Sequence, residues 1–258
     1  MKPELIVMLT CNDVTVSNAA EVFASCADLP AKRWGFKDVG LDKDAMIALN
    51  QQMKAAGKET YLEVVIYTEA GCLEGAKLAG ECGFDYLTGT VYYPAVMEVL
   101  AKYDMKYLPF PGKVDGSPVA LTGTVDEIVA DSKRLIEAGA DGVDLTAYRY
   151  TDGDPMALAR AVGEAIGLDK LTIAGSVSDE KRMDEMKALG CKAYTMGSAL
   201  FGGNFVQGGT FRENLIYVLD YLDKEQSDEA FCRHRHGHAE HARLSLRSGR
   251  QICRGCEQ

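Results

Sequence analysis

The chain has 258 residues, of which 47% are hydrophobic and 26% are charged, and its formal net charge at pH 7 is -10. This balance is typical of a globular α/β protein, and the length suits one large domain. The acidic charge argues against DNA or RNA as a partner, because phosphate backbones are bound by clustered Lys and Arg. It does not exclude an anionic substrate, because a pocket can be positive on a negative body.

The sequence contains no run of about 18 apolar residues, so we expect no membrane span. The N-terminal segment 1–8 reads as a strand and lacks the apolar core and cleavage site of a signal peptide. We therefore expect a cytoplasmic protein. Five of the eight cysteines fall in expected strands and helices, where we interpret them as reduced and mostly buried: Cys11, Cys26, Cys72, Cys82 and Cys191.

Short β-rich runs alternate along the chain with amphipathic stretches of about 10–15 residues, a pattern typical of repeated βα units and a parallel sheet. The sequence predicts eight strands: Leu5–Thr10, Arg33–Val39, Thr60–Ile66, Tyr86–Val91, Lys106–Gly112, Gly142–Tyr148, Lys170–Val177 and Ala193–Leu200. Helices are predicted between and after them: Asp42–Ala56, Glu69–Cys82, Pro94–Lys102, Val125–Ala138, Pro155–Ile166, Asp179–Leu189 and Phe211–Lys224.

Four of these helices end in a glycine, at Gly57, Gly83, Gly139 and Gly190. A glycine there supplies the left-handed conformation that turns the chain back into a strand. An open doubly wound sheet is an alternative, but eight units without a clear second domain favour closure into a (β/α)8 barrel. We assign residues 1–227 to this single barrel domain and residues 228–258 to a C-terminal tail.

Two Gly-Ser pairs provide the strongest chemical signal. Gly175-Ser176 and Gly197-Ser198 each stand where a strand, the seventh or the eighth, gives way to a helix or turn. Glycine lets a phosphate approach the backbone, exposed amides donate to it, and the serine hydroxyls add donors. Phosphate sites in (β/α)8 barrels are commonly built from the loops after strands 7 and 8. We therefore expect a phosphorylated small-molecule substrate, although the glycines also suit tight turns alone.

The segments Ala174–Val177 and Thr195–Leu200, with a helix ending at Leu189-Gly190 between them, resemble the paired signature of the ribulose-phosphate-binding barrels. That group includes isomerases of the histidine and tryptophan pathways, indole-glycerol-phosphate synthase, and sugar-phosphate lyases and epimerases. The resemblance is specific over roughly residues 170–203 and architectural elsewhere. It implies the same fold and a phosphorylated substrate.

Four charged residues are candidates for the barrel lumen. Strand alternation turns Glu63 and Asp144 away from their apolar neighbours and toward the lumen. Lys37 closes the second strand and Lys113 follows the fifth, so both ammonium groups are expected to pair with these carboxylates in the lumen. A lysine could polarise a carbonyl while a carboxylate moves a proton, which makes Lys37, Glu63, Lys113 and Asp144 the catalytic candidates. A purely structural ion-pair network is the alternative.

Four further residues are accessory candidates. Cys11 or Asp13, after the first strand, could act as a base opposite Asp144, in the manner of sugar-phosphate isomerases that the sequence resembles; for Cys11 a packing role is favoured. Arg149 could bind a second anionic group or be a solvated loop residue. Asp38 is a candidate only as a carboxylate ligand of a metal ion.

No histidine precedes residue 234, so a barrel histidine, a histidine-ligated metal and a Ser-His-Asp triad are all excluded from the expected chemistry. We expect no required cofactor and assign no metal ligand. If a metal is used, Mg2+ held by carboxylates such as Glu63, Asp144 and Asp38 fits best.

The tail contains all four histidines, and its Cys253-x2-Cys256 spacing is compatible with zinc. It lacks a second clear ligand pair and a hydrophobic nucleus, so a disordered basic tail is the favoured interpretation. The residues concerned are Cys232, His234, His236, His238, His241, Cys253 and Cys256.

The leading functional hypothesis is a lyase or isomerase acting on a sugar phosphate or a related compound. The strand-six lysine of Schiff-base aldolases is missing from Asp144–Tyr148. A quinolinate-type phosphoribosyl transferase and a non-catalytic phosphometabolite-binding barrel remain alternatives. The sequence is compatible with a homo-oligomer and leaves its substrate open.

Overall fold

The computed structural model describes residues 2–223. Residues up to Leu215 form one compact unit and a second begins at Ile216; the barrel lies in the first. Residues 211–223 are helical, as expected for the last helix. The expected boundary at residues 227/228 and the whole tail, including its candidate zinc ligands, lie outside the described residues.

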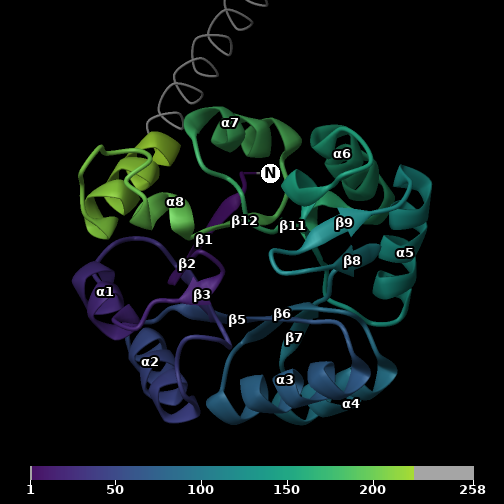
Figure 1. The fold of residues 1–258 in the computed structure, drawn as a ribbon, viewed down its shortest axis with the longest axis horizontal. Coiled ribbons are helices and arrows are strands. Elements are labelled where there is room, and N and C mark those ends of the chain that lie inside the picture. The colour runs from purple at the N-terminus through teal and green to yellow at the C-terminus, as the bar shows by residue number, and fades with distance from the viewer. Residues whose placement is uncertain (1, 224–258) are drawn as a thin grey trace, which may run out of the picture. The chain divides into compact units, whose positions relative to one another are not determined.

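Eight parallel strands form the main sheet, as the sequence predicted (Figure 1). They are β1 (Glu4–Met8), β4 (Arg33–Lys37), β5 (Glu59–Ile66), β6 (Tyr86–Thr90), β7 (Lys106–Leu108), β10 (Val143–Leu145), β11 (Leu171–Ile173) and β12 (Ala193–Met196). Their order is β10-β11-β12-β1-β4-β5-β6-β7. The two end strands meet as well: the amides of Asp141 and Asp144 donate to the carbonyls of Tyr107 and Pro109, both over 3.0 Å. The ring is therefore nearly closed.

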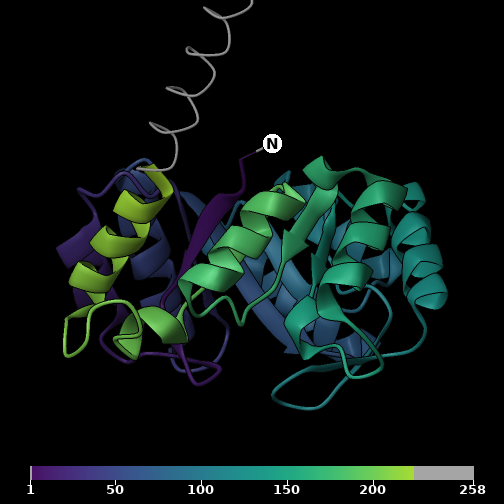
Figure 2. The same cartoon turned by 90° about the horizontal axis from the view of Figure 1, so that it is seen from above.

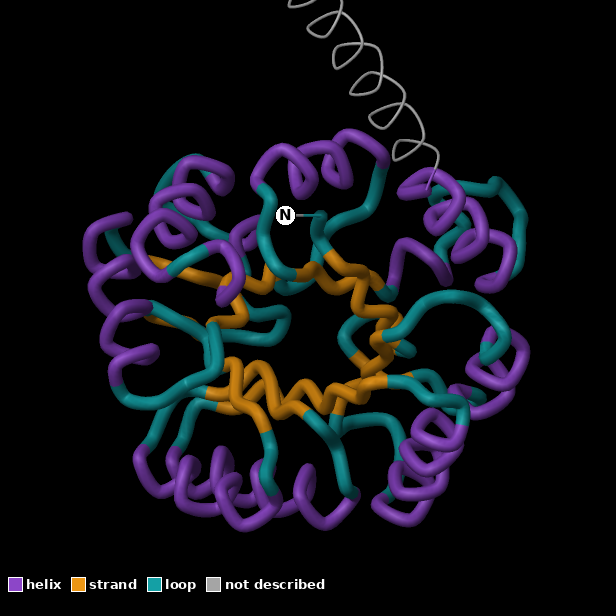
Figure 3. The backbone as a smooth tube through the Cα atoms, turned by 180° about the vertical axis from the view of Figure 1, so that it is seen from behind, coloured by secondary structure: helices purple, strands orange, loops and turns teal. Residues whose placement is uncertain are grey.

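Helices surround this ring of strands on the outside (Figure 3). They are α1 (Ala19–Cys26), α2 (Lys43–Ala55), α3 (Glu69–Cys82), α4 (Pro94–Leu100), α5 (Val125–Glu137), α6 (Pro155–Ile166), α7 (Glu180–Leu189) and the short α8 (Ser198–Phe201). The sequence analysis did not predict α1. The residue before a helix caps it in five cases, where the side chain accepts an amide of the first turn: Asp42, Thr68, Thr124, Asp154 and Asp179. The strand and helix pattern thus confirms a (β/α)8 barrel.

The four glycines that were predicted to stop helices all have positive φ, between 71° and 99°. These residues are Gly57, Gly83, Gly139 and Gly190. A residue with a Cβ would be strained in this conformation, which explains why glycine stands at these helix ends.

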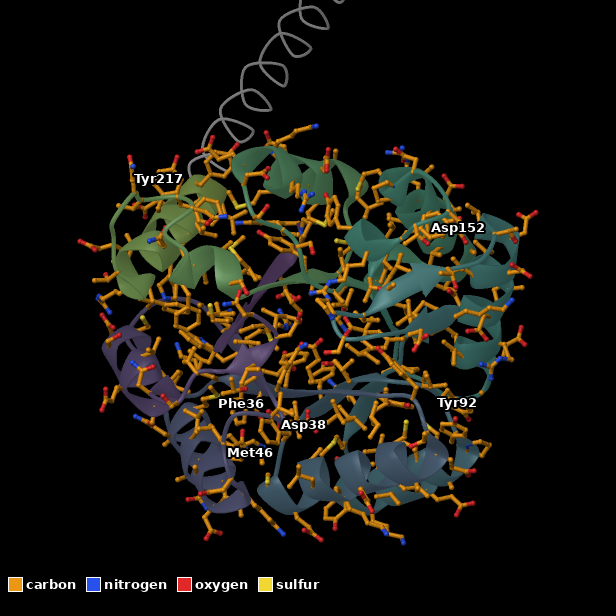
Figure 4. All side chains as sticks on the ribbon, viewed as in Figure 1. Phe36, Asp38, Met46, Tyr92, Asp152 and Tyr217 are labelled. Carbon is orange, nitrogen blue, oxygen red and sulfur yellow. The ribbon has the colours of Figure 1, made fainter. Side chains whose placement is uncertain are left out.

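Side chains alternate between the lumen and the helices along each strand. On β4, Phe36 points outward in the direction of Met46 of α2 (Figure 4), and both are buried. Its neighbour Lys37 therefore faces the lumen. Deeper in the lumen, Tyr61 and Tyr86 stack with ring centroids 4.3 Å apart inside an apolar cluster. The layer that contains Tyr61 and Tyr86 is thus a packed apolar part of the lumen, and polar side chains line the lumen beyond it.

Two antiparallel hairpins that the sequence analysis did not predict follow strands of the ring. The first joins β2 (Thr10–Cys11) to β3 (Val14–Thr15), and the second joins β8 (Lys113–Asp115) to β9 (Ala120–Thr122). In Figures 1 and 2 the β8–β9 hairpin reaches over one end of the ring, the end opposite to the chain's N-terminus.

The predicted fifth strand was too long. It ends at Leu108 rather than at Gly112, because Pro109 and Pro111 have no amide hydrogen to donate to a neighbouring strand. The chain then leaves the ring and begins the β8–β9 hairpin at Lys113.

The five described cysteines are free thiols, and all except the half-buried Cys11 are buried, which confirms the sequence-based interpretation. Within residues 2–223, the helices are too short or too polar to cross a membrane.

Candidate active site

A cavity of about 320 Å³ opens at the carboxyl ends of the strands. Both Gly-Ser pairs line it, together with Lys37 and Glu63. In (β/α)8 barrels this end of the ring carries the active site. The structure therefore brings the expected phosphate-binding turns and two of the expected catalytic side chains to one cavity.

The turn after β11 presents free backbone amides to this cavity. Gly175 and Ser176 both have left-handed backbones, with φ of 69° and 60°, and the amide of Gly175 donates to the Thr195 hydroxyl over 2.6 Å. The amides of Ser176, Val177 and Ser178 meet no acceptor within the part of the chain that the structure describes. Unpaired amides that line a cavity are suited to bind an anion.

The turn after β12 completes the other side of the cavity. The amides of Ser198 and Ala199, which begin α8, also lack a protein acceptor among residues 2–223. The hydroxyl of Ser198 accepts from the amide of Asn12 over 3.1 Å. A Cβ on Gly197 would stand 2.5 Å from the carbonyl oxygen of Thr10. Gly197 is therefore required by its close approach to the neighbouring chain, whereas a Cβ on Gly175 would meet nothing within 4 Å.

Lys37 stands between two carboxylates. Its ammonium lies 2.8 Å from Asp13 and 3.7 Å from Glu63, and its side chain is only 8% exposed. The strand register pairs Lys37 directly with Glu63 across β4 and β5, which keeps the two side chains at one level of the lumen. Asp13 also binds Arg149, whose Nη2 lies 3.3 Å from its Oδ1. One carboxylate thus bridges the two cations of the cavity wall.

A two-residue turn positions Asp13. Asn12 and Asp13 lie between β2 and β3 and have φ of 51° and 63°. Two consecutive positive φ values define the type I′ turn, whose twist suits a hairpin and whose positions favour Asn and Asp. The Asn-Asp pair between Thr10-Cys11 and Val14-Thr15 was therefore a signal for this hairpin that the sequence analysis did not use.

Burial and charge shift the pKa values of the three carboxyl groups in different directions. Partial burial raises the pKa of Asp13, but the hydrogen bond and charge of Lys37 and the charge of Arg149 outweigh it, so the pKa is lowered. Burial raises the pKa of Glu63, against the charge of Lys37. Burial, reinforced by the charge of Glu63, raises the pKa of Asp144 well above its usual range. Asp13 therefore ionises more readily than a free aspartic acid, whereas Glu63 and Asp144 ionise less readily than free carboxylic acids do.

Several buried polar atoms around the cavity have no hydrogen-bond partner among residues 2–223. They are Oγ1 of Thr10, Oγ1 of Thr146, Oδ1 of Asp144 and Nη1 of Arg149. Three of these residues line the cavity, and Asp144, which is 1% exposed, lies behind it. Unsatisfied polar groups are rare in protein interiors, and a catalytic role or a bound ligand is one explanation for them. The sequence analysis missed Thr10, Thr146 and Thr195, because single threonines in strands carry no distinctive signal.

The predicted lumen position of Lys113 is wrong. Its side chain is 75% exposed on β8, and its nearest described carboxylate is that of Glu127 on α5, 3.9 Å away. The two prolines that end β7 early carry the chain out of the ring before Lys113. Cys11 is half-buried in the β2–β3 hairpin and does not line the cavity.

The carboxylates expected to hold Mg2+ are not gathered into one site. Within residues 2–223, no three His, Cys, Asp or Glu side chains are grouped as a metal would require. Asp38, labelled in Figure 4, follows β4. Unlike Glu63, it does not line the cavity. Burial raises the pKa of Asp38.

Comparisons with known proteins identify the fold. No family model and no curated protein sequence matches the chain. Among solved structures, the native KDPGal structure has a TM-score of 0.59 at 12% identity and covers 86% of this chain and 98% of its own. Orotidine 5′-phosphate decarboxylase from Pyrococcus horikoshii OT3 has a TM-score of 0.58 at 14% identity, with 84% and 99% covered. The tryptophan synthase α2β2 complex of Pyrococcus furiosus gives 0.56 at 12% identity, with 83% and 94% covered.

At these identities the likeness is one of fold. It agrees with the (β/α)8 fold that the resemblance of the Gly-Ser turns implied. The described part of the chain forms a (β/α)8 barrel with the architecture of orotidine 5′-phosphate decarboxylase and of the tryptophan synthase α-subunit.

Proposed function

We propose that the protein is a lyase or isomerase that acts on a small phosphorylated substrate. The observation that carries this proposal is one cavity lined both by unpaired amides and by charged residues. The amides of Ser176–Ser178 and Ser198-Ala199 would receive the phosphate, and Lys37 and Glu63 would face the reacting carbon atoms. A phosphorylated substrate is also named for one protein of this fold, orotidine 5′-phosphate decarboxylase.

Lys37 is proposed to stabilise negative charge on a substrate oxygen. Its ammonium is nearly buried and is held in place by Asp13 over 2.8 Å. A fixed ammonium in a partly dry cavity stabilises an enolate oxygen without reorganising during the reaction.

Glu63 is proposed as the group that moves the proton. It lines the cavity, whereas Asp144 is 1% exposed behind it. Burial raises the pKa of Glu63 above its ordinary value, which makes its carboxylate a stronger base. The Glu63 carboxylate would accept a proton from a carbon beside a carbonyl, and the electron pair would move onto the oxygen next to Lys37.

A thermal-unfolding screen tests the phosphate site. We would compare phosphorylated compounds with their unphosphorylated counterparts, such as ribose 5-phosphate with ribose and fructose 6-phosphate with fructose. A ligand at 100 times its Kd stabilises a protein by about 2.7 kcal/mol. That corresponds to a rise of roughly 5–10 °C in Tm for a domain of this size.

The Ser176→Asp variant places a negative charge in the turn after β11 and should abolish this rise. Ser25→Asp is the matched control, because Ser25 is exposed on α1 and does not line the cavity. A full thermal shift in Ser176→Asp would show that the turn does not hold the phosphate.

Turnover of a phosphorylated ligand then separates an enzyme from a phosphometabolite-binding barrel. Lys37→Met and Glu63→Gln should both lower turnover, and unchanged turnover in both would remove the catalytic assignment. Binding without turnover in the wild-type protein would support the binding barrel. Adding 5-phosphoribosyl 1-pyrophosphate to the screen tests the phosphoribosyl transferase alternative.

A further inference from the structure

Arg182 holds the turn after β11 from outside the cavity. It lies in the first turn of α7 and does not line the cavity, yet its guanidinium donates to the backbone carbonyl of Ser176. The guanidinium also stacks on the ring of Tyr148, 4.4 Å from the centroid. Tyr148 in turn donates its hydroxyl to Glu185, one helical turn further along α7, over 2.6 Å. Tyr148 and Glu185, which we call the platform, thus hold the guanidinium of Arg182 in place for its hydrogen bond to Ser176.

Because of the geometry of the peptide bond, the contact between Arg182 and the Ser176 carbonyl also sets the direction of the Val177 amide. Among residues 2–223 the cis peptide bond is Ser117–Pro118, so the bond between Ser176 and Val177 is trans. In a trans peptide the carbonyl and the next amide point in opposite directions within one plane. Because Arg182 draws the Ser176 carbonyl toward α7, the amide of Val177 points away from α7. Val177 lines the cavity and its amide has no protein acceptor in the described chain.

A second contact fixes the same turn two residues later. The side-chain amide of Asn204 donates to the carbonyl of Ser178 over 3.0 Å. The turn is therefore held at two carbonyls, by Arg182 from α7 and by Asn204 from the segment after α8. Its left-handed Ser176 (φ 60°) is unusual for a residue with a side chain and needs such restraint.

We propose that Arg182 is a positioning residue for phosphate binding: by holding the Ser176 carbonyl on the side of α7, it aims the Val177 amide at the anion. This inference rests on the proposed phosphate site. Arg182 does not line the cavity, so in this arrangement it makes no direct contact with the phosphate. Its effect on binding acts through the backbone of the turn after β11.

Titration with inorganic phosphate tests the inference on the full chain. We expect Arg182→Met to bind phosphate at least tenfold more weakly than the wild type. Arg182→Lys, which keeps a donor for the Ser176 carbonyl, should recover part of the affinity. Arg134→Met is the matched control: Arg134 also lies over a tyrosine ring, that of Tyr92 at 5.6 Å, but on α5 and away from the cavity lining. Its affinity should equal that of the wild type.

The backbone readout separates positioning from a general loss of stability. In a 1H–15N spectrum the Val177 amide should shift on addition of phosphate in the wild type and in Arg134→Met, and not in Arg182→Met. Tyr148→Leu removes the aromatic ring under Arg182 and keeps the arginine, so it should weaken phosphate binding less than Arg182→Met does. If Arg182→Met fails to fold, Tyr148→Leu tests the proposal in its place.

Phosphate affinity of folded Arg182→Met or Tyr148→Leu within twofold of the wild type, with an unchanged Val177 response, would overturn the role of Arg182. A different result, no phosphate binding by the wild type itself, would overturn the proposed phosphate site and this inference with it.

Discussion

The ammonium of Lys37 lies 2.8 Å from the carboxylate of Asp13, a residue 24 positions earlier in the chain. Asp13 occupies a left-handed position of a two-residue turn and also reaches Arg149, which follows β10. Without this carboxylate the two cations would stand beside each other in a partly buried cavity, where like charges repel. Asp13 therefore holds both in place.

Asp13→Asn should lower the free energy of unfolding at pH 7 by about 1.5–3 kcal/mol, the range for hydrogen bonds to charged groups. The pKa of Asp13 is lowered in the folded protein, so its contribution is present above the ordinary carboxyl pKa and is lost as the pH falls. Urea unfolding at pH 7 and pH 3 checks both statements. The difference from the wild type should shrink at pH 3, and a constant difference would contradict the ion-pair explanation. Asp28→Asn, at an exposed pair with Arg212, should change stability less.

Glu63 should determine the acid side of the pH–rate profile. Its pKa is raised by burial, and the form that accepts a proton is the carboxylate. The rate with a phosphorylated substrate should therefore rise with pH through a pKa above the ordinary value of 4.5. Glu63→Gln should lose this limb and lower kcat by about 10²–10⁴-fold, as for a general base. An unchanged acid limb in Glu63→Gln would exclude Glu63 as the base.

Asp144 should make the folded wild-type protein less stable toward unfolding as the pH rises. Its pKa is raised in the folded protein by burial and by Glu63, so the folded state keeps a proton that the unfolded state has lost. The wild type should lose stability relative to Asp144→Asn as the pH increases from about 4, where an unfolded aspartate ionises. Unfolding free energies of the two proteins between pH 4 and pH 8 check this. A wild-type stability that stays constant or increases relative to Asp144→Asn over this range would contradict a raised pKa of Asp144.

Gly175 and Gly197 should respond differently to alanine. A Cβ at Gly197 would clash with the carbonyl oxygen of Thr10 at 2.5 Å, and backbone must move to relieve it. We expect Gly197→Ala to lose about 2 kcal/mol or more, within the range for overpacked sites. Gly175→Ala has open space and pays only for its left-handed backbone, about 1 kcal/mol. Thermal unfolding of both variants tests this order, and equal losses would contradict it.

Lys113→Ala should leave the binding of a phosphorylated ligand and the stability unchanged. The side chain is 75% exposed, and its contact with Glu127 is a surface pair that solvent screens. Lys37→Met, by contrast, removes a cation that lines the cavity. Loss of binding in Lys113→Ala would mean that the β8–β9 hairpin moves Lys113 to the ligand.

The sequence by itself determined the features that depend on a few neighbouring residues: the faces of the strands, the ends of the helices and the tight turns. Alternation within β5 and β10 placed Glu63 and Asp144 on the inner side of their strands, and the helix-ending glycines marked the repeat that builds the ring. The Gly-Ser pairs marked the ends of β11 and β12 for the same reason, because tight turns have local requirements.

Only the tertiary structure decided which of these groups meet. Asp13 and Arg149 are 136 positions apart, and Asn12 and Ser198 are 186 positions apart, yet each pair is in contact at the mouth of the barrel. Such contacts depend on the closure of the ring, on a two-residue turn after β1 and on the two prolines that send Lys113 outward. The contacts themselves are long-range consequences of packing, and the period of a strand or helix carries no information about which distant residues will meet.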